Sequence, residues 1–201
     1  MSRLLVIMTM SLLLFGGATF ASGWYLVRNL PTIALDALPA PPPCPAGIQA
    51  PVDVNDRVAR FILAVEGNSP PSLPWPVPPD QLTRYVADLS IPEPAPERRS
   101  YLSRLARALQ LGLFFRRSEI ESAFLARVYF GKAAFGYRCA AQVYFGKAAS
   151  ELNQEEAIFL AGLPKAPNRN IGDTSADEAH RRKTLASLRR HGLIGEATTS
   201  N

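Results

Sequence analysis

A heptapeptide that occurs twice constrains the fold of this chain more than any other feature. Val-Tyr-Phe-Gly-Lys-Ala-Ala spans residues 128–134 and returns fifteen residues later, at residues 143–149. Repeat proteins need a longer unit and at least three copies to bury a continuous core, so this pair belongs to one local structure. Each glycine permits a left-handed turn at the end of an apolar helix. The pair therefore predicts a tightly packed corner between helices.

Apolar side chains in the rest of the chain recur with the period of an α-helix, and no convincing strand alternation appears. Ser118 and Glu121 have the spacing of a helix-starting capping box, and Asn153 and Glu156 have it too. Helices are expected over about 54–66, from residue 80, over 102–113, from 118, over 153–163, and from 175 to a C-terminal cap at 192. The predicted fold class is all-α.

The first 28 residues form a separate segment. Residues 4–26 carry no charge and lie between Arg3 and Arg28, and 23 helical residues are long enough to cross a bilayer. Trp24 and Tyr25 suit the membrane interface. The alternative is a cleaved signal peptide, because residues 19–21 offer a loose cleavage pattern. We expect residues 1–28 to be an uncleaved transmembrane signal-anchor, which places the rest outside the cytoplasm.

A proline-rich segment follows the apolar one. Residues 29–52 contain seven prolines, which predicts a stiff linker between the membrane and the folded part. We expect one helical domain over residues 53–195 and a short tail over 196–201.

Two cysteines and a modest positive charge bound the chemistry. Cys44 lies in the proline-rich linker and Cys139 in an apolar helical stretch. A disulfide between them is one reading for an oxidising compartment, but the pattern favours Cys139 as a small, buried and unpaired hydrophobic residue. No Cys/His cluster indicates a metal site. A net charge of +5 suits an anionic partner without choosing among lipids, pyrophosphates and nucleic acids.

The wording around the doubled heptapeptide points to a family. "LARVYFGKAAFGYRCAAQVYFGKAASELNQEEAIFLAGLPKAPNRN", residues 125–170, resembles glycosyltransferase family 51, the peptidoglycan glycosyltransferases. The family's fourth motif reads approximately LNxVYFGxGxYGxxxAAxxYFGK, and LxxxExAxLAGLPxAP follows it. The resemblance implies a lysozyme-like transglycosylase domain behind a single N-terminal transmembrane helix. It also implies a reaction that polymerises lipid II into glycan strands and releases a polyprenyl pyrophosphate.

The resemblance assigns roles to individual residues. Glu66 stands at the position of the general base that removes a proton from the acceptor sugar. Lys165 stands where a basic residue approaches the substrate phosphates, and positive charge there stabilises the leaving group. The remaining substrate-binding candidates are Lys132, Arg127 and Thr83. The resemblance implies no cofactor and no metal, apart from a divalent cation such as Mg²⁺ if the chain is active.

Several catalytic positions depart from the family pattern. Arg104 falls at the position of the second catalytic glutamate, and residues 98–118 contain no Asp or Glu at all. Asp88 replaces a phosphate-binding lysine, which reverses the charge. Gly67 replaces the Asp that normally follows the base. The motifs that stabilise the fold are kept, whereas those that carry chemistry are eroded.

Two functions follow from this contrast. The favoured one is a pseudoenzyme of peptidoglycan synthesis that binds lipid II, a glycan strand or another cell-wall synthesis protein, with reduced or no turnover. The alternative is a catalytically active, divergent monofunctional transglycosylase. Both place a single-pass protein in the bacterial inner membrane with its domain on the periplasmic side. Membrane lipids are expected partners, and nucleic acid is not.

Overall fold

The computed structural model describes residues 33–47, 51–67, 80–91, 101–167 and 174–195. Their helices are α2 (Arg57–Glu66), α3 (Gln81–Leu89), α4 (Tyr101–Phe114), α5 (Arg117–Arg127), α6 (Tyr137–Phe145), α7 (Gln154–Gly162) and α8 (Thr174–Arg190). Two short 3₁₀ turns are η2 (Ala149–Glu151) and η3 (Leu163–Lys165). Within these ranges no strand forms beyond one isolated bridge between Tyr129 and Phe135. The all-α prediction is confirmed.

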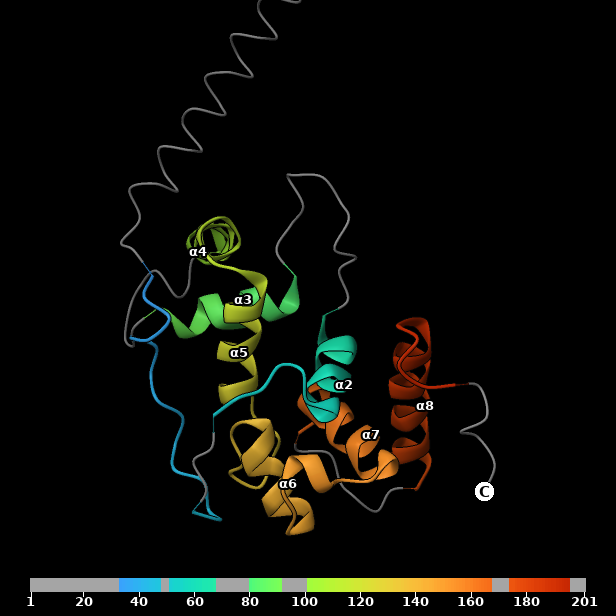
Figure 1. Cartoon of the computed structure of the whole chain (residues 1–201). Coiled ribbons are helices and arrows are strands. Elements are labelled where there is room, and N and C mark those ends of the chain that lie inside the picture. The colour runs from blue at the N-terminus through green and yellow to red at the C-terminus, as the bar shows by residue number, and fades with distance from the viewer. Residues whose placement is uncertain (1–32, 48–50, 68–79, 92–100, 168–173, 196–201) are drawn as a thin grey trace, which may run out of the picture.

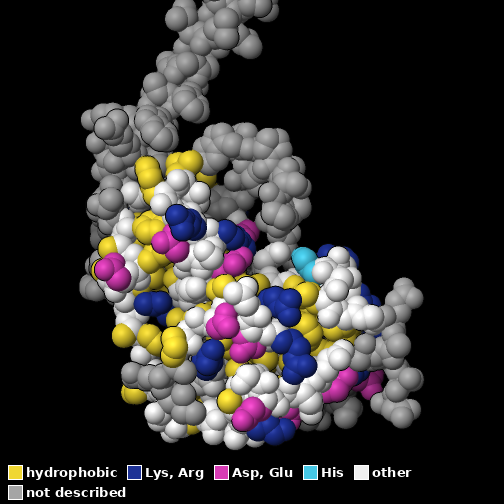
Figure 2. Space-filling view, in the orientation of Figure 1, with side chains coloured by type: hydrophobic (Ala, Val, Ile, Leu, Met, Phe, Trp, Pro, Cys, Tyr) yellow, Lys and Arg dark blue, Asp and Glu magenta, His cyan; other side chains and the backbone are white. Residues whose placement is uncertain are grey.

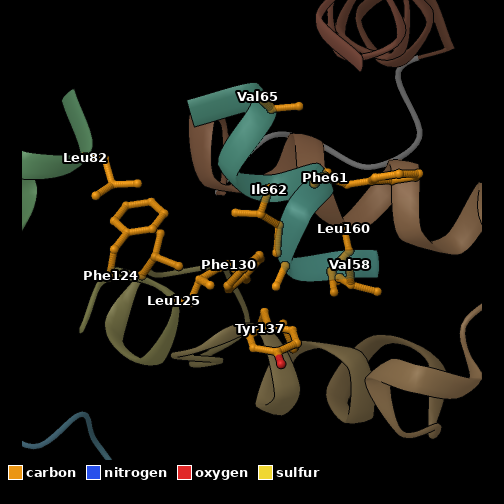
Figure 3. Packing of buried hydrophobic residues seen from close by; sticks show 14 of the residues in the cluster. Val58, Phe61, Ile62, Val65, Leu82, Phe124, Leu125, Phe130, Tyr137 and Leu160 are labelled. Carbon is orange, nitrogen blue, oxygen red and sulfur yellow. The ribbon is translucent and has the colours of Figure 1, made fainter. Parts of the chain in front are cut away.

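The helices form two groups that share one core (Figure 1). In one group α3 packs against α4 and α5, and in the other α2 packs against α7 and α8. Side chains from both groups converge on α2, whose Val58 and Ile62 are fully buried. Figure 3 shows them meeting Phe124 of α5 and Leu160 of α7. Burial of large apolar side chains at this junction stabilises the packing of α2.

The first turn of α5 differs from the sequence expectation. The capping box predicted at Ser118 and Glu121 does not form. The helix begins earlier, with Arg116 at its N-cap, and Glu119 accepts a hydrogen bond from the Arg116 backbone N–H at 2.7 Å. Glu121 instead accepts from Nε of Arg117 at 2.8 Å. Glu119, two positions before Glu121, therefore takes the place in the capping box that the sequence assigns to Glu121.

The doubled heptapeptide forms a corner, but only its second copy ends a helix as predicted, because the first copy lies in an extended turn closed by the bridge between Tyr129 and Phe135. α5 ends just before the first copy, and α6 ends inside the second with Gly146 in the left-handed conformation. Gly131 and Gly136 also have positive φ, at 88° and 79°. The Tyr144 hydroxyl donates to the Phe130 carbonyl at 2.9 Å and so ties one copy to the other. The corner is a fixed packing unit rather than a repeat.

The proline-rich segment is fastened to the domain where the structure describes it, over residues 33–47. Ile33 and Leu38 are each only 6% exposed. Nε of Arg127 donates to the Pro39 carbonyl at 3.0 Å. We call residues 33–47 the strap. The strap is thus part of the folded unit rather than a free spacer, while the domain boundaries themselves stay a prediction.

The preference for an unpaired Cys139 is wrong. Cys44 and Cys139 form a disulfide, with their α-carbons 5.7 Å apart. Cys139 is buried as expected, at 5% exposure. The strap carries Cys44 to it from 95 residues away, a proximity that the local pattern around either cysteine does not encode.

The predicted signal-anchor, residues 1–28, lies outside the described residues. None of the helices that are described has the length and apolar character needed to span a bilayer.

Replacing Gly131 by alanine should destabilise the corner more than replacing Gly146. Both glycines have positive φ, which costs an L-residue about 1–2 kcal/mol. A β-carbon at Gly131 would lie 2.3 Å from the Pro167 carbonyl oxygen, whereas nothing lies within 4 Å at Gly146. Overpacking should therefore add about 1–3 kcal/mol to the loss at Gly131 alone. Denaturant unfolding of both variants measures the difference, and equal losses would refute the close approach.

Removing the disulfide should cost about 2–5 kcal/mol of unfolding free energy, since the bond closes a long loop in the unfolded chain. We expect reductant to lower the denaturation midpoint of the wild type. The matched control is the double variant Cys44→Ala with Cys139→Ala, whose midpoint should be low with or without reductant. Two titratable thiols in the native, oxidised protein would contradict the bond.

Candidate active site

The candidate site is built around the C-terminal end of α2. Glu66 is the last residue of this helix, and the Gly67 N–H closes it by donating to the Leu63 carbonyl at 2.7 Å. Ser187 of α8 donates its hydroxyl to the Ala64 carbonyl at 2.9 Å. Because α8 binds one of the last carbonyls of α2, the two helices fix where the Glu66 side chain begins.

Glu66 is a buried carboxyl with an unpaired oxygen. Its side chain is 4% exposed, and Oε1 has no hydrogen-bond partner in the described part of the chain. A buried polar atom without a partner costs free energy, and such atoms collect at functional sites. The arrangement is therefore unusual for a carboxyl with only a structural role.

Lys165 approaches the same helix end from η3. Its ammonium group donates to the Val65 carbonyl, next to Glu66. The path to this position is set locally: Asn153 caps α7, Glu156 completes the capping box, and Pro164 turns the chain into η3. The two residues that the resemblance pairs as base and phosphate contact thus lie together.

Burial and charge act in opposite directions on Glu66. Loss of hydration raises the pKa of its carboxyl, and the positive charge of Lys165 offsets part of that rise. A carboxyl with a raised pKa holds and releases a proton closer to neutral pH. Chemically, the pair can serve as a proton acceptor beside a cation, which is what glycosyl transfer to a sugar hydroxyl needs.

A second charged group lies at the edge of this site. Nη1 of Arg117 contacts Oδ2 of Asp80 at 2.5 Å, and Nε contacts Glu121. Burial acts to raise the pKa of Asp80, but its hydrogen bonds with Thr83 and the Arg117 guanidinium outweigh burial and leave that pKa lowered. Acidic and basic side chains lie interleaved over the face that carries α3, α5 and α2 (Figure 2).

The other predicted binding residues make contacts of their own. Thr83 is 5% exposed, and its backbone N–H donates to Asp80 at 2.8 Å. Arg127 holds the strap through Pro39. The ammonium of Lys132 lies 4.6 Å from the centroid of the Tyr144 ring. The structure thus brings Glu66 and Lys165 together and gives these three residues packing contacts.

Arg104, at the position of the second glutamate, faces Asp88. Its guanidinium lies 3.9 Å from the Asp88 carboxylate, between α4 and α3. The two charge reversals that the sequence shows are therefore neighbours in space. Arg104 itself offers no proton-accepting group.

The Arg117–Asp80 pair is the feature that sequence reasoning missed. The sequence predicts a helix that begins at Asp80 and assigns no role to Arg117. Their separation of 37 residues leaves no periodic signal. Only the packing of α3 against α5 brings them together.

Comparison with known proteins decides the family. The transglycosylase family profile matches residues 80–190, more than half of the chain. The chain belongs to the transglycosylase family. This confirms the resemblance to glycosyltransferase family 51, and the all-helical fold is consistent with its lysozyme-like domain. Glu66 precedes the matched residues, so its role rests on geometry and on the resemblance.

A curated relative extends this comparison. Penicillin-binding protein 1A/1B of Bacillus subtilis (strain 168) is 31% identical over 93 residues. The aligned part is 45% of this chain and 10% of the relative. The chain thus spans about a tenth of the length of the relative that it matches.

Replacing Glu66 by glutamine should stabilise the protein at neutral and alkaline pH but not in acid. Because the folded-state pKa is raised above 4.5, the unfolded chain loses this proton first as pH rises. Stability is therefore fully present below about pH 4.5 and is lost as pH rises through the folded pKa. Glutamine carries no such proton.

Thermal melts between about pH 4 and pH 8 test this, because the gain in melting temperature from Glu66→Gln should grow with pH. Glu178→Gln, at an exposed position of α8, serves as the control and should show no such trend. A gain that stays constant across the range would refute the raised pKa.

Proposed function

We propose that this protein binds lipid II at the site formed by Glu66 and Lys165, with reduced or no polymerisation. The observation that carries the proposal is the meeting of these two residues at the end of α2, where Lys165 binds the Val65 carbonyl. Membership in the transglycosylase family supports lipid II or a glycan strand as the ligand.

Binding requires little beyond an accessible cation. Lys165 lies on an exposed turn and donates to a neutral carbonyl, so its charge is not cancelled by a carboxylate in hydrogen-bond contact. A pyrophosphate favours such a position because charge-assisted hydrogen bonds are the strong ones. The doubled corner holds the turn in place, since Gly131 packs closely against Pro167.

Turnover requires more than the site offers. At 4% exposure, Glu66 presents little of its carboxyl to an acceptor sugar. Proton transfer by a positioned side chain contributes about 10²–10⁴-fold to a rate. Arg104 replaces the second carboxylate and pairs with Asp88, so a further contribution is missing.

Placement outside the cytoplasm has structural support. Disulfides persist in oxidising compartments, and Cys44 and Cys139 are bonded. We therefore place the domain on the periplasmic side of the bacterial inner membrane, held by residues 1–28 as a single-pass anchor. Membrane lipids and other cell-wall synthesis proteins complete the proposed partners.

The proposed binding involves no metal ion. Among the described residues no group of three His, Cys, Asp or Glu side chains is arranged to hold one. The proposed binding needs none, because Lys165 supplies the positive charge.

The alternative is an active, divergent transglycosylase. The retained base position and the raised pKa of Glu66 favour it, since both suit a general base. A movement that uncovers Glu66 would be needed before the acceptor sugar could react.

Purified full-length protein distinguishes the two functions. We expect measurable binding of lipid II, weakened about tenfold or more by Lys165→Ala because a charge-assisted hydrogen bond is lost. Little or no glycan polymer should form. Polymer made by the wild type and abolished by Glu66→Gln would establish the active enzyme instead. Undiminished binding by the Lys165→Ala variant would refute the assigned phosphate contact.

A further inference from the structure

Arg117 places an accessible hydrogen-bond donor beside the end of α2. A β-carbon at Gly67 would lie 3.4 Å from Nη2 of Arg117, and Gly67 directly follows Glu66. The Arg117 side chain is 48% exposed, whereas Glu66 is 4% exposed. The covered carboxyl thus has an open donor at its side.

The orientation of this donor is fixed by two carboxylates. Nη1 contacts Asp80 at 2.5 Å and Nε contacts Glu121 at 2.8 Å. Asp80 is itself held, because it caps α3 and its side chain is 5% exposed. A guanidinium is planar and rigid, so binding two of its nitrogens sets the direction of the third. Within the described part of the chain, nothing accepts a hydrogen bond from Nη2.

The charge around Arg117 selects the kind of acceptor. Two carboxylates face one guanidinium, so the group as a whole is net negative and does not attract an anion. Lys165 donates to a neutral carbonyl and remains the better partner for a phosphate. An uncharged acceptor, such as a sugar hydroxyl or the carbonyl of an N-acetyl group, fits Nη2.

We propose that Arg117 is a glycan-binding residue, whose Nη2 donates to a hydroxyl or N-acetyl oxygen of the sugar beside Glu66. This inference rests on the proposed function and assigns the two ends of the ligand to two different residues. Lys165 binds the phosphate end of the ligand, and Arg117 binds the sugar end. Gly67 lies next to the contact: a β-carbon there would touch Nη2 at 3.4 Å and would meet the Leu63 carbonyl oxygen at 2.7 Å.

Two soluble probes separate these roles in the full-length protein: chitotetraose for the sugar end and farnesyl pyrophosphate for the phosphate end. Arg117→Lys keeps the positive charge next to Asp80 but removes the donor Nη2. Because Arg117→Lys lacks Nη2, we expect this variant to bind chitotetraose about tenfold more weakly and farnesyl pyrophosphate unchanged. Lys165→Ala should give the reverse pattern. Arg60→Lys, at an exposed position of α2, is the control and should change neither.

Each outcome has a definite reading. Wild-type binding of chitotetraose that Arg117→Lys does not weaken overturns the glycan contact and leaves the proposed function standing. Equal loss of both probes in a folded Arg117→Lys variant also overturns it, and a thermal melt shows whether that variant is unfolded. If it is, Glu121→Ala, which removes the acceptor of Nε but keeps the Asp80 contact, should still weaken chitotetraose binding selectively. Failure of the wild type to bind either probe overturns the proposed function and the glycan contact together.

Discussion

The close approach of two backbones, at Gly131 and Pro167, is the contact on which the site depends. No side chain longer than a hydrogen fits there, because a β-carbon at Gly131 would lie 2.3 Å from the Pro167 carbonyl oxygen. Pro167 follows the turn that carries Lys165, so the corner sets how near Lys165 comes to α2. Tyr144 reinforces the same junction through the Phe130 carbonyl. The doubled heptapeptide thus helps to hold the Lys165 ammonium against the C-terminal end of α2.

The strap adds a second constraint outside the region that matches the family. It is fixed by buried Ile33 and Leu38, by Arg127 at Pro39, and by the disulfide at Cys44. Three attachments along one short segment leave it little freedom relative to α6. Arg127, which the resemblance places among the substrate contacts, therefore also connects the strap to the corner.

Local features were predictable from sequence, and distant pairings were not. The apolar period, the Asn153–Glu156 capping box and the glycine turns each involve residues within one or two helical turns, so their pattern is legible in the chain. The capping box at Ser118 failed because a neighbouring acidic residue competed for the same role. The disulfide and the Arg117–Asp80 pair depend on packing between elements far apart in sequence. Glu66 and Lys165 were linked only through the resemblance, since 100 residues separate Lys165 from its partner Val65.

Under the proposed function, the electrostatics of the site favours binding a ligand over transforming it. Burial keeps Glu66 from water and raises its pKa, so the proton-accepting form is the costly one. The nearest cation, Lys165, offsets this only in part. At the outer edge, Asp80 and Glu121 neutralise Arg117, and further along α3 Arg104 faces Asp88. Positive charge is thus concentrated on Lys165 alone among the contacts described for the site. A ligand can be anchored by that one cation and by directional donors, whereas a developing pyrophosphate charge would need several cations at once.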